Sequence, residues 1–224
     1  GGAQAIAAFA FGTKLIKKAD KVFGPGNQYV AEAKKQLFGF IGIDLPAGPS
    51  EVLVIANNKS NPSWIAYDVL AQGEHDPNAK TYVIAKNKNI LLKVKKELQR
   101  IMKETKLKNV DRSIKNNCYL ILAKSQKEIF EISNFIAPEH LHIHEKFNKN
   151  ILKHIINAGS VFLGEKSPVA LGDYTIGTNH VLPTDQTAKF SSGLGVEDFT
   201  KKTVFIKPGN KTLKKIAKPT INLA

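Results

Sequence analysis

The feature that most constrains the fold of this chain is an alternation of short β-rich runs with amphipathic stretches between residues 51 and 195. The β-rich runs are, in order, EVLVIAN, TYVIA, CYLILA, HLHI and SVFLG. Apolar residues at helical spacing separate them, in NPSWIAYDVL, in a long lysine-rich stretch, in QKEIFEISNFI and in NILKHIINA. Such alternation is typical of βαβ units, and it predicts an α/β domain of Rossmann-like type with a largely parallel sheet.

The segments on either side of this domain have a different character. Residues 1–50 contain a helix-like opening, a strand-like DKVFG, the turn GPGN and a second helix through QYVAEAKKQLF. This order predicts the C-terminal part of another, incomplete Rossmann-like domain. Residues 196–224 contain one strand-like run and a helix, with two prolines and no apolar core of their own. We expect this C-terminal extension to need a partner surface.

The formal net charge of +14 raises the question of a nucleic-acid partner, because phosphate contacts come from clustered Lys and Arg. Only two of the 33 basic residues are arginine, Arg100 and Arg112. The lysines are spread along stretches that would form solvated helix faces. Since arginine is the residue that pairs bidentately with phosphate and guanine, the sequence argues against nucleic-acid binding.

Neither a membrane nor an oxidising compartment is indicated. No apolar run approaches the roughly 20 residues that a membrane-spanning helix needs. The single cysteine, Cys118, excludes an internal disulfide, and a reducing, cytoplasmic setting fits best. The chain opens with GGAQAIAAFAFG, without an initiating Met or a basic leader, and we expect it to be cut from a longer protein.

The first candidate ligand pair is Gln72 and His75, in the segment AQGEHDP. The preceding run starts with Asn61 and Pro62 at the cap and first-turn positions of a predicted helix, so the pair lies near the C-terminal end of that helix. Side chains three residues apart project from one helix face. A glutamine oxygen and an imidazole nitrogen could therefore meet the same ligand or metal ion.

The segment APEHLHIH contains the strongest candidates for proton transfer. Glu139 and His140 stand at the start of a predicted short strand, where adjacent residues point to opposite faces. They are either a carboxylate and an imidazole base, or a surface residue and a satisfied polar group at a strand edge. His142 and His144 continue on the face of His140, so a three-histidine metal site is conceivable, although the strand separates these side chains by roughly 7 Å.

Asp173 lies just after a glycine in a polar, turn-rich segment, soon after the run SVFLG. Loops beyond strand ends are where α/β proteins place ligand groups. With Gln72 and His75 it completes a set of one carboxylate, one imidazole and one amide oxygen, which zinc accepts. His180 is either a fourth ligand or a structural group bonded to a turn carbonyl.

Two turn-rich segments are ambiguous by themselves. GPGN, at residues 24–27, stands where a strand passes into a helix, so its free backbone N–H groups favour an anionic group, but a plain tight turn explains it too. Ser50, in AGPSE, either caps a strand or holds a ligand.

Taken together, eight segments of the chain resemble the histidinol dehydrogenase family. They are GGAQAIAA, FGPGNQYV, AGPSEVLVIA, LAQGEHD, APEHL, NAGSVFLGE, GDYTIGTNHVLPT and SSGLGVEDF, and they cover the chain in order with compatible spacing. The resemblance implies the last step of histidine biosynthesis, the oxidation of L-histidinol to L-histidine through the aldehyde with two NAD⁺ in succession. It also implies one zinc ion per subunit, which orients the substrate, and a homodimer.

The resemblance assigns roles to individual residues of this chain. Gln72, His75 and Asp173 match zinc ligands that also contact the substrate. His140 matches the general base, which also contacts the substrate, and Glu139 matches the residue that activates water for the second oxidation. The remaining matches are two NAD contacts and one substrate contact: Gln4, Asn27 and Ser50.

The chain departs from the family pattern at both ends. The family has a fourth zinc ligand, a histidine preceded by a substrate-contacting glutamate, in a C-terminal tail that completes the partner subunit's site, and this chain stops at TINLA. The first nucleotide-binding segment is also missing. We therefore expect an internal fragment that binds zinc weakly and turns over poorly. The alternative is a catalytically inactive zinc-binding homologue, against which the presence of both Glu139 and His140 argues.

Overall fold

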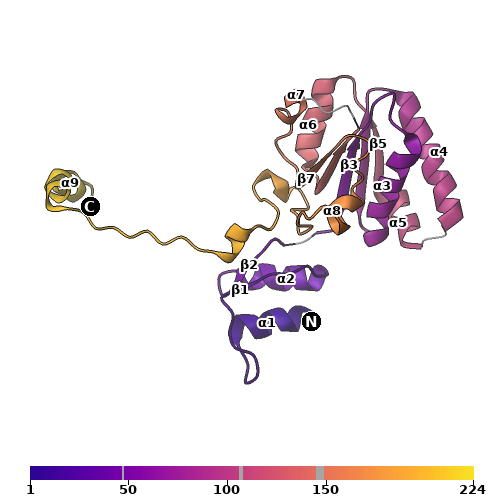
Figure 1. The fold of residues 1–224 in the computed structure, drawn as a ribbon. Helices are drawn as coiled ribbons and strands as arrows, with labels where there is room; N and C mark the ends of the chain where they lie inside the picture. Colours follow the sequence, from indigo (N-terminus) through magenta and orange to yellow (C-terminus); the bar gives the residue numbers. More distant parts are fainter. Residues whose placement is uncertain (47, 106–107, 145–148) are drawn as a thin grey trace.

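In a computed structural model, which describes residues 1–46, 48–105, 108–144 and 149–224, the chain forms two parallel sheets and a C-terminal extension. Figure 1 shows the larger sheet flanked by helices, a smaller unit with α1 and α2, and helix α9 set apart at the end of an extended segment. The predicted α/β class with parallel sheets is confirmed. The division at residues 50 and 195 stays a prediction.

The larger sheet has five parallel strands in the order β5-β4-β3-β6-β7. The strands are β3 (Glu51–Ile55), β4 (Lys80–Ala85), β5 (Cys118–Leu122), β6 (His140–Ile143) and β7 (Ser160–Leu163). The chain order runs outward from β3 in one direction and then from β6 in the other, as in a Rossmann fold. The point where this order reverses lies between β3 and β6.

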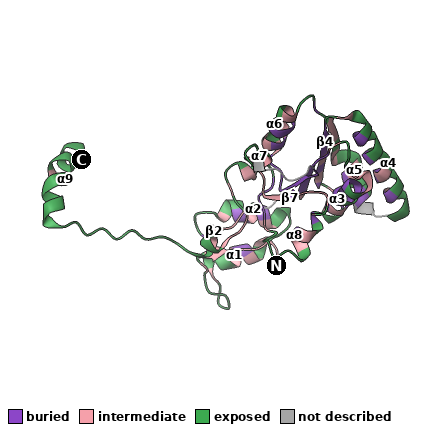
Figure 2. Cartoon of the chain, turned by 45° about the horizontal axis from the view of Figure 1, so that its top comes forward, coloured by how far each residue is buried: buried purple, intermediate pink, exposed green. Residues whose placement is uncertain are grey.

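Helices cover both faces of this sheet. They are α3 (Pro62–His75), α4 (Lys88–Thr105), α5 (Lys108–Asn117), α6 (Gln126–Ile136), α7 (Lys149–Leu152) and α8 (Ala170–Tyr174). Every residue of β3 is buried, with Val52 and Val54 in the core that contains α3 and α4, and Leu53 and Ile55 in the core that contains α6. Figure 2 shows this burial along the central strands. Burial on both faces explains why the strand reads as a continuous apolar run.

The start of α3 follows the sequence prediction. The Asn61 side chain accepts hydrogen bonds from the backbone N–H groups of Ser63 (2.9 Å) and Trp64 (3.4 Å), and Pro62 occupies the first turn. These bonds satisfy amides that have no partner within the helix. The cap therefore fixes the helix that carries Gln72 and His75 at its other end.

Two predicted helices have different bounds in the structure. Helix α7 ends at Leu152, so most of NILKHIINA is not helical, because the Asn134 side chain accepts hydrogen bonds from the N–H groups of Ile156 (2.9 Å) and Asn157 (3.2 Å). These amides are not available to carbonyls one helical turn earlier. A further helix, α5, follows the lysine-rich α4, and residues 106–107 between them lie outside the described residues.

The N-terminal unit consists of α1 (Ala3–Phe11), β1 (Lys21–Val22), α2 (Gln28–Leu37) and β2 (Gly42–Ile43), and its two strands pair in parallel. Lys34 and Asp44 form an ion pair with almost fully buried side chains. The Lys34 ammonium also donates to the Gly24 carbonyl, and Gly24 N–H donates to the Asp44 carboxylate (2.7 Å). This network holds the GPGN turn in place.

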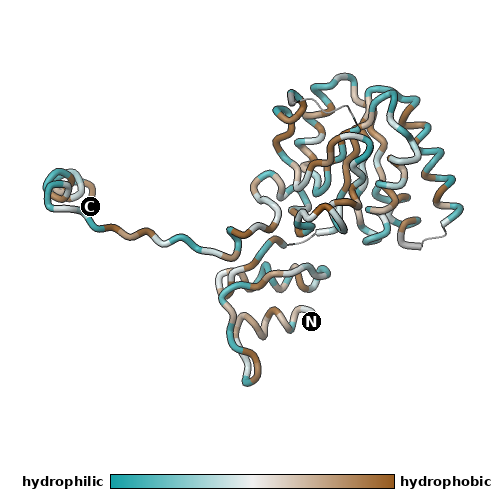
Figure 3. The backbone as a smooth tube through the Cα atoms, viewed as in Figure 1, coloured by the Kyte–Doolittle hydropathy of each residue, from teal (hydrophilic) through white to brown (hydrophobic). Residues whose placement is uncertain are grey.

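The C-terminal part contains two short 3-10 helices, Thr187–Lys189 and Val196–Phe199, and helix α9 (Asn210–Leu223). The strand-like run TVFI forms no strand, since it has no neighbouring strand to pair with, and Val204, Phe205 and Ile206 are 81%, 91% and 84% exposed. Figure 3 shows a hydrophobic stretch, in brown, along the extended segment that leads to α9. None of the helices described is both long and apolar enough to cross a bilayer.

Candidate active site

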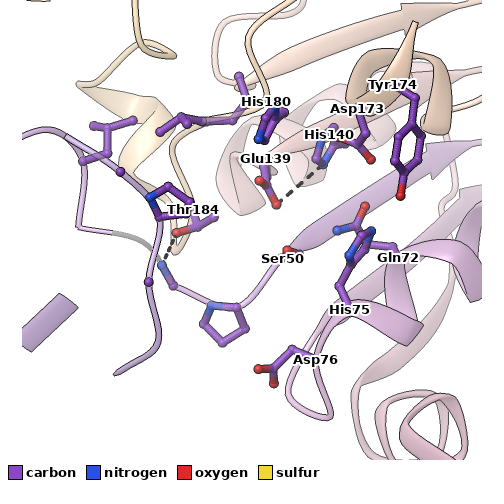
Figure 4. A pocket seen from close by; sticks show the side chains of 18 residues that line it. Ser50, Gln72, His75, Asp76, Glu139, His140, Asp173, Tyr174, His180 and Thr184 are labelled. Atoms are coloured by element: carbon purple, nitrogen blue, oxygen red, sulfur yellow. Dashed lines mark hydrogen bonds and ion pairs between the residues drawn. The ribbon is translucent and has the colours of Figure 1, made fainter. Parts of the chain in front are cut away.

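A cavity of about 540 Å³ lies at the amino-terminal edge of β3 and β6, between the larger sheet and the N-terminal unit (Figure 4). The structure brings together here most of the residues singled out from the sequence: Ser50, Gln72, His75, Glu139, His140 and Asp173. They come from separate parts of the chain, since parallel pairing aligns the starts of β3 and β6 with the end of α3.

His140 is held as a neutral base. Its Nδ1 lies 3.1 Å from the Glu51 carbonyl oxygen, and because a carbonyl only accepts, the ring proton is on Nδ1. The other nitrogen, Nε2, keeps its lone pair and lies 3.9 Å from Asp173 Oδ1. Burial lowers the pKa of His140. A neutral imidazole with a free Nε2 at the cavity has the form that proton abstraction requires.

Glu139 lies beside this base. Its Oε2 accepts a hydrogen bond from Glu51 N–H (2.9 Å) and lies 3.6 Å from His140 Nδ1. Burial, to which the neighbouring Glu51 and Asp173 carboxylates add, raises the pKa of Glu139 to about 8. The expectation that Glu139 and His140 point to opposite faces is wrong, because Glu139 precedes β6 and both side chains line the cavity.

Gly159 allows the backbone around Glu139 to close up. A Cβ atom at Gly159 would lie 2.5 Å from the Glu139 carbonyl oxygen. The same approach brings Gly159 N–H to the Pro138 carbonyl (3.0 Å) and Ser160 N–H to the Glu139 carbonyl (2.9 Å). The lack of a side chain at Gly159 thus allows the start of β7 to pair with the start of β6, where His140 and Ser160 are neighbours.

Gln72 and His75 project from the C-terminal end of α3 into the cavity, side by side in Figure 4. The Gln72 side chain is only 3% exposed, and among the described residues its amide has no hydrogen-bond partner. A buried amide without a protein partner suits a ligand of an ion or substrate. With His75 and Asp173 it offers one nitrogen and two kinds of oxygen, which fit zinc.

Asp173 reaches the cavity by a route that the sequence did not indicate. It lies in the short helix α8, where a polar loop was expected, and this helix returns the chain toward the amino-terminal edge of the sheet. Tyr174, His180 and Thr184 also line the cavity. Tyr174 was missed, and its position directly after Asp173 was the available signal.

A second cavity, of about 580 Å³, adjoins the first and shares Gly26, Gly48, Pro49 and Asp76 with it. Asn27 lines it, and its side-chain oxygen caps α2 by accepting from Tyr29 N–H (3.1 Å) and Val30 N–H (3.2 Å). Gln4 is exposed on α1 and lines neither cavity.

The structure does not bring His140, His142 and His144 together as a three-histidine site. His142 and His144 lie near the Asp68 carboxylate of α3, with their ring centroids 4.3 Å apart, whereas His140 turns to Glu51 and Asp173. Burial, with a contribution from His142, lowers the pKa of His144 to about 3.

The strand order and this cavity define a class: an α/β protein with a Rossmann-type sheet and a cavity that gathers histidine, carboxylate and amide side chains. The family model described as histidinol dehydrogenase matches residues 1–224. The chain belongs to the histidinol dehydrogenase family, and the resemblance of the eight segments is confirmed.

Individual relatives agree with this assignment. The chain is 46% identical over 225 residues to the histidinol dehydrogenase of Bacillus cereus, a match that covers 100% of this chain and 52% of the relative. It is 48% identical over 207 residues to that of Listeria monocytogenes, covering 92% of this chain and 48% of the relative. The crystal structure of histidinol dehydrogenase from Elizabethkingia anophelis matches with a TM-score of 0.93 at 40% identity, covering 100% of this chain and 52% of that one. The chain spans about half the length of these relatives.

Proposed function

We propose that the protein catalyses the zinc-dependent, four-electron oxidation of L-histidinol to L-histidine through L-histidinal, with two NAD⁺, as its family membership suggests. The observation that carries the proposal is the His140 imidazole, whose Nδ1–H donates to the Glu51 carbonyl so that its Nε2 stays a free base at the cavity. Hydride leaves a carbinol carbon only as the hydroxyl proton is removed, so the reaction needs such a base.

Gln72, His75 and Asp173 would hold the zinc ion. The support is their shared cavity, their donor types and the unpartnered Gln72 amide. When bound, zinc supplies a template that orients the imidazole and amino groups of the substrate. Ser50, at the start of β3, lines the same cavity and is the proposed additional substrate contact.

His140 serves both oxidations. Its Nε2 takes the hydroxyl proton of the alcohol in the first oxidation, releases it to solvent, and then takes the hydroxyl proton of the hydrated aldehyde in the second. Glu139, in its ionised form, takes a proton from the water that hydrates the aldehyde. The Glu51 backbone orients both groups, since its carbonyl accepts from His140 and its N–H donates to Glu139. NAD⁺, when bound, accepts one hydride in each oxidation.

The second cavity is the proposed place for NAD⁺, because it adjoins the first and Asn27 lines it at the start of α2. Gln4 lies outside both cavities, and its contact with NAD⁺ stays a prediction.

The protein is proposed to work as a homodimer, in which the C-terminal extension packs on a second copy. Residues 200–224 support this proposal, since Val204, Phe205 and Ile206 are exposed on a segment without a strand partner among the described residues. Light scattering of the purified protein measures the oligomeric state. A monomer at micromolar concentration would exclude the packing of the C-terminal extension on a second copy.

The test of the activity is the number of NADH formed per L-histidinol consumed by the complete gene product with zinc. Two NADH per substrate, with a severe loss in His140→Ala, support the four-electron dehydrogenase and its base. No NADH from a folded, zinc-loaded protein would favour the catalytically inactive zinc-binding homologue.

A further inference from the structure

Asp68, His142 and His144 form a buried cluster apart from the cavity at the amino-terminal edge. His142 lies in β6 and His144 directly after its last residue, and Asp68 faces them from α3. Their ligand atoms lie within 4.8 Å of one another, and the residues are 5%, 1% and 3% exposed. We propose that these three residues form a second metal site, which takes a borderline divalent ion such as Zn²⁺.

The hydrogen bonds of His142 call for a cation between it and Asp68. His142 Nε2 lies 2.9 Å from the Gly164 carbonyl oxygen, so Nε2 carries the ring proton. Nδ1 then turns its lone pair to Asp68 Oδ2, only 2.5 Å away. Two lone pairs at this distance repel unless a proton or a metal ion lies between them. A histidine that donates its other N–H to a backbone carbonyl is the usual arrangement of a metal ligand.

The surroundings of His144 favour a metal ion over a shared proton. Both of its ring nitrogens are buried and have no hydrogen-bond partner among the residues that the structure describes. A proton shared by Asp68 and His142 satisfies those two residues but leaves His144 with the full cost of an unpaired buried polar group. An ion bound by all three side chains satisfies them together.

The cluster needs only side-chain movement to close around an ion. Zinc holds nitrogen and oxygen ligands at about 2.0–2.2 Å, which puts the ligand atoms about 3.3–3.6 Å apart. Asp68 and His142 would therefore separate slightly from their present 2.5 Å. The His144 ring, which has no hydrogen bond to any described residue, would turn inward.

The position also matches where Rossmann folds bind ligands, at the carboxyl ends of the strands where the strand order reverses. His144 stands at this point between β3 and β6: its N–H donates to the Ile55 carbonyl (2.9 Å) and its carbonyl accepts from the Asn57 side chain (3.0 Å). A cavity of about 300 Å³, lined by Trp64 and Glu165 among others, reaches Asp68 and His142 and gives an ion a path inward.

Cobalt binding tests the proposal independently of turnover. The full chain with Gln72→Ala and His75→Ala, which removes ligands of the first proposed site, is stripped with a chelator and titrated with Co²⁺, followed by visible absorption and equilibrium dialysis. We expect one Co²⁺ per chain. His144→Gln should weaken this binding at least tenfold, whereas His154→Gln, at an exposed histidine, should leave it unchanged.

Nuclear magnetic resonance of the protein labelled with ¹⁵N at histidine tests the site without substituting Asp68, His142 or His144. In the same background, Zn²⁺ should shift one ring nitrogen each of His142 and His144. Failure to retain Co²⁺, equal affinity in His144→Gln, or ring-nitrogen shifts that Zn²⁺ leaves unchanged would overturn the proposal. Co²⁺ binding at this cluster in the double variant, together with no NADH from the folded, zinc-loaded wild-type protein, would contradict only the proposed activity.

Discussion

The two ends of β6 use the same residue type in opposite ways. His140, at the amino-terminal end, has one nitrogen tied to the Glu51 carbonyl and the other free at an open cavity. His142, two residues further on the same face, lies between the Asp68 carboxylate and the Gly164 carbonyl and is almost fully buried. Strand alternation places both rings on one face, but the neighbouring carbonyls and carboxylates decide which ring is a free base.

The largest expected effect is on catalysis at the open end. His140→Ala should lower kcat for L-histidinol oxidation by about 10²- to 10⁴-fold, because the hydroxyl proton loses its acceptor. NADH formation by the complete gene product measures this. His154→Ala, at an exposed ring, should stay within about twofold of the wild type. An equal loss of kcat in His140→Ala and His154→Ala would contradict a role of His140 as the base.

The next effect is on stability at the closed end. Asp68→Ala should lower the free energy of unfolding by about 3 kcal/mol in the presence of a chelator, because it leaves His142 buried without its partner. Urea denaturation measures the loss. Asp111→Ala removes a carboxylate that is 54% exposed and pairs with Lys115, and it should cost less than about 0.5 kcal/mol. A similar cost at both positions would mean that burial of the Asp68–His142 pair is energetically unimportant.

The third effect depends on pH and concerns Glu139. Its pKa of about 8 in the folded protein lies above the ordinary value of 4.5, so the folded state holds more protons than the unfolded state between these pH values. This contribution to stability is complete below pH 4.5 and is lost as pH rises through 8, with a slope of at most about 1.4 kcal/mol per pH unit.

Glu139→Gln should remove that part of the pH dependence, as urea denaturation from pH 5.5 to 8.5 would measure. Glu131→Gln, at a side chain that is 61% exposed, serves as the control. A pH dependence that Glu139→Gln leaves as steep as in the wild type would contradict the raised pKa.

The smallest effect concerns the ring between the two histidines. Phe162 lies 6.0 Å from His140 and 6.4 Å from His142, measured between ring centroids. Phe162→Leu keeps most of the packing and should cost about 1 kcal/mol in the free energy of unfolding, with Phe135→Leu, at an exposed ring, near zero. A loss of more than about 3 kcal/mol for Phe162→Leu would mean that both histidines depend on the Phe162 ring for their positions.

Sequence reasoning predicted the parts of the fold that local patterns determine. Asn61 and Pro62 predicted the start of α3, and the apolar runs predicted the strands of the larger sheet. Five of the family segments, FGPGNQYV, AGPSEVLVIA, LAQGEHD, APEHL and GDYTIGTNHVLPT, also contain most of the residues that line the cavity.

The parts that it missed depend on contacts between distant segments. Asp68 stands within an apolar helical run, and only the packing of α3 on β6 makes it the partner of His142. Helix α7 is shortened by Asn134, a side chain from α6. No local pattern records these contacts.

The site's position at the amino-terminal edge of the sheet has an electrostatic consequence. Helices α3 and α6 both end at this edge, and a helix C-terminus carries a dipole charge of about −0.5. The adjoining cavity instead faces the N-terminus of α2, where the dipole charge is positive. The backbone dipoles therefore add negative potential where α3 and α6 end and positive potential where α2 begins, so these helix ends favour ions of opposite charge.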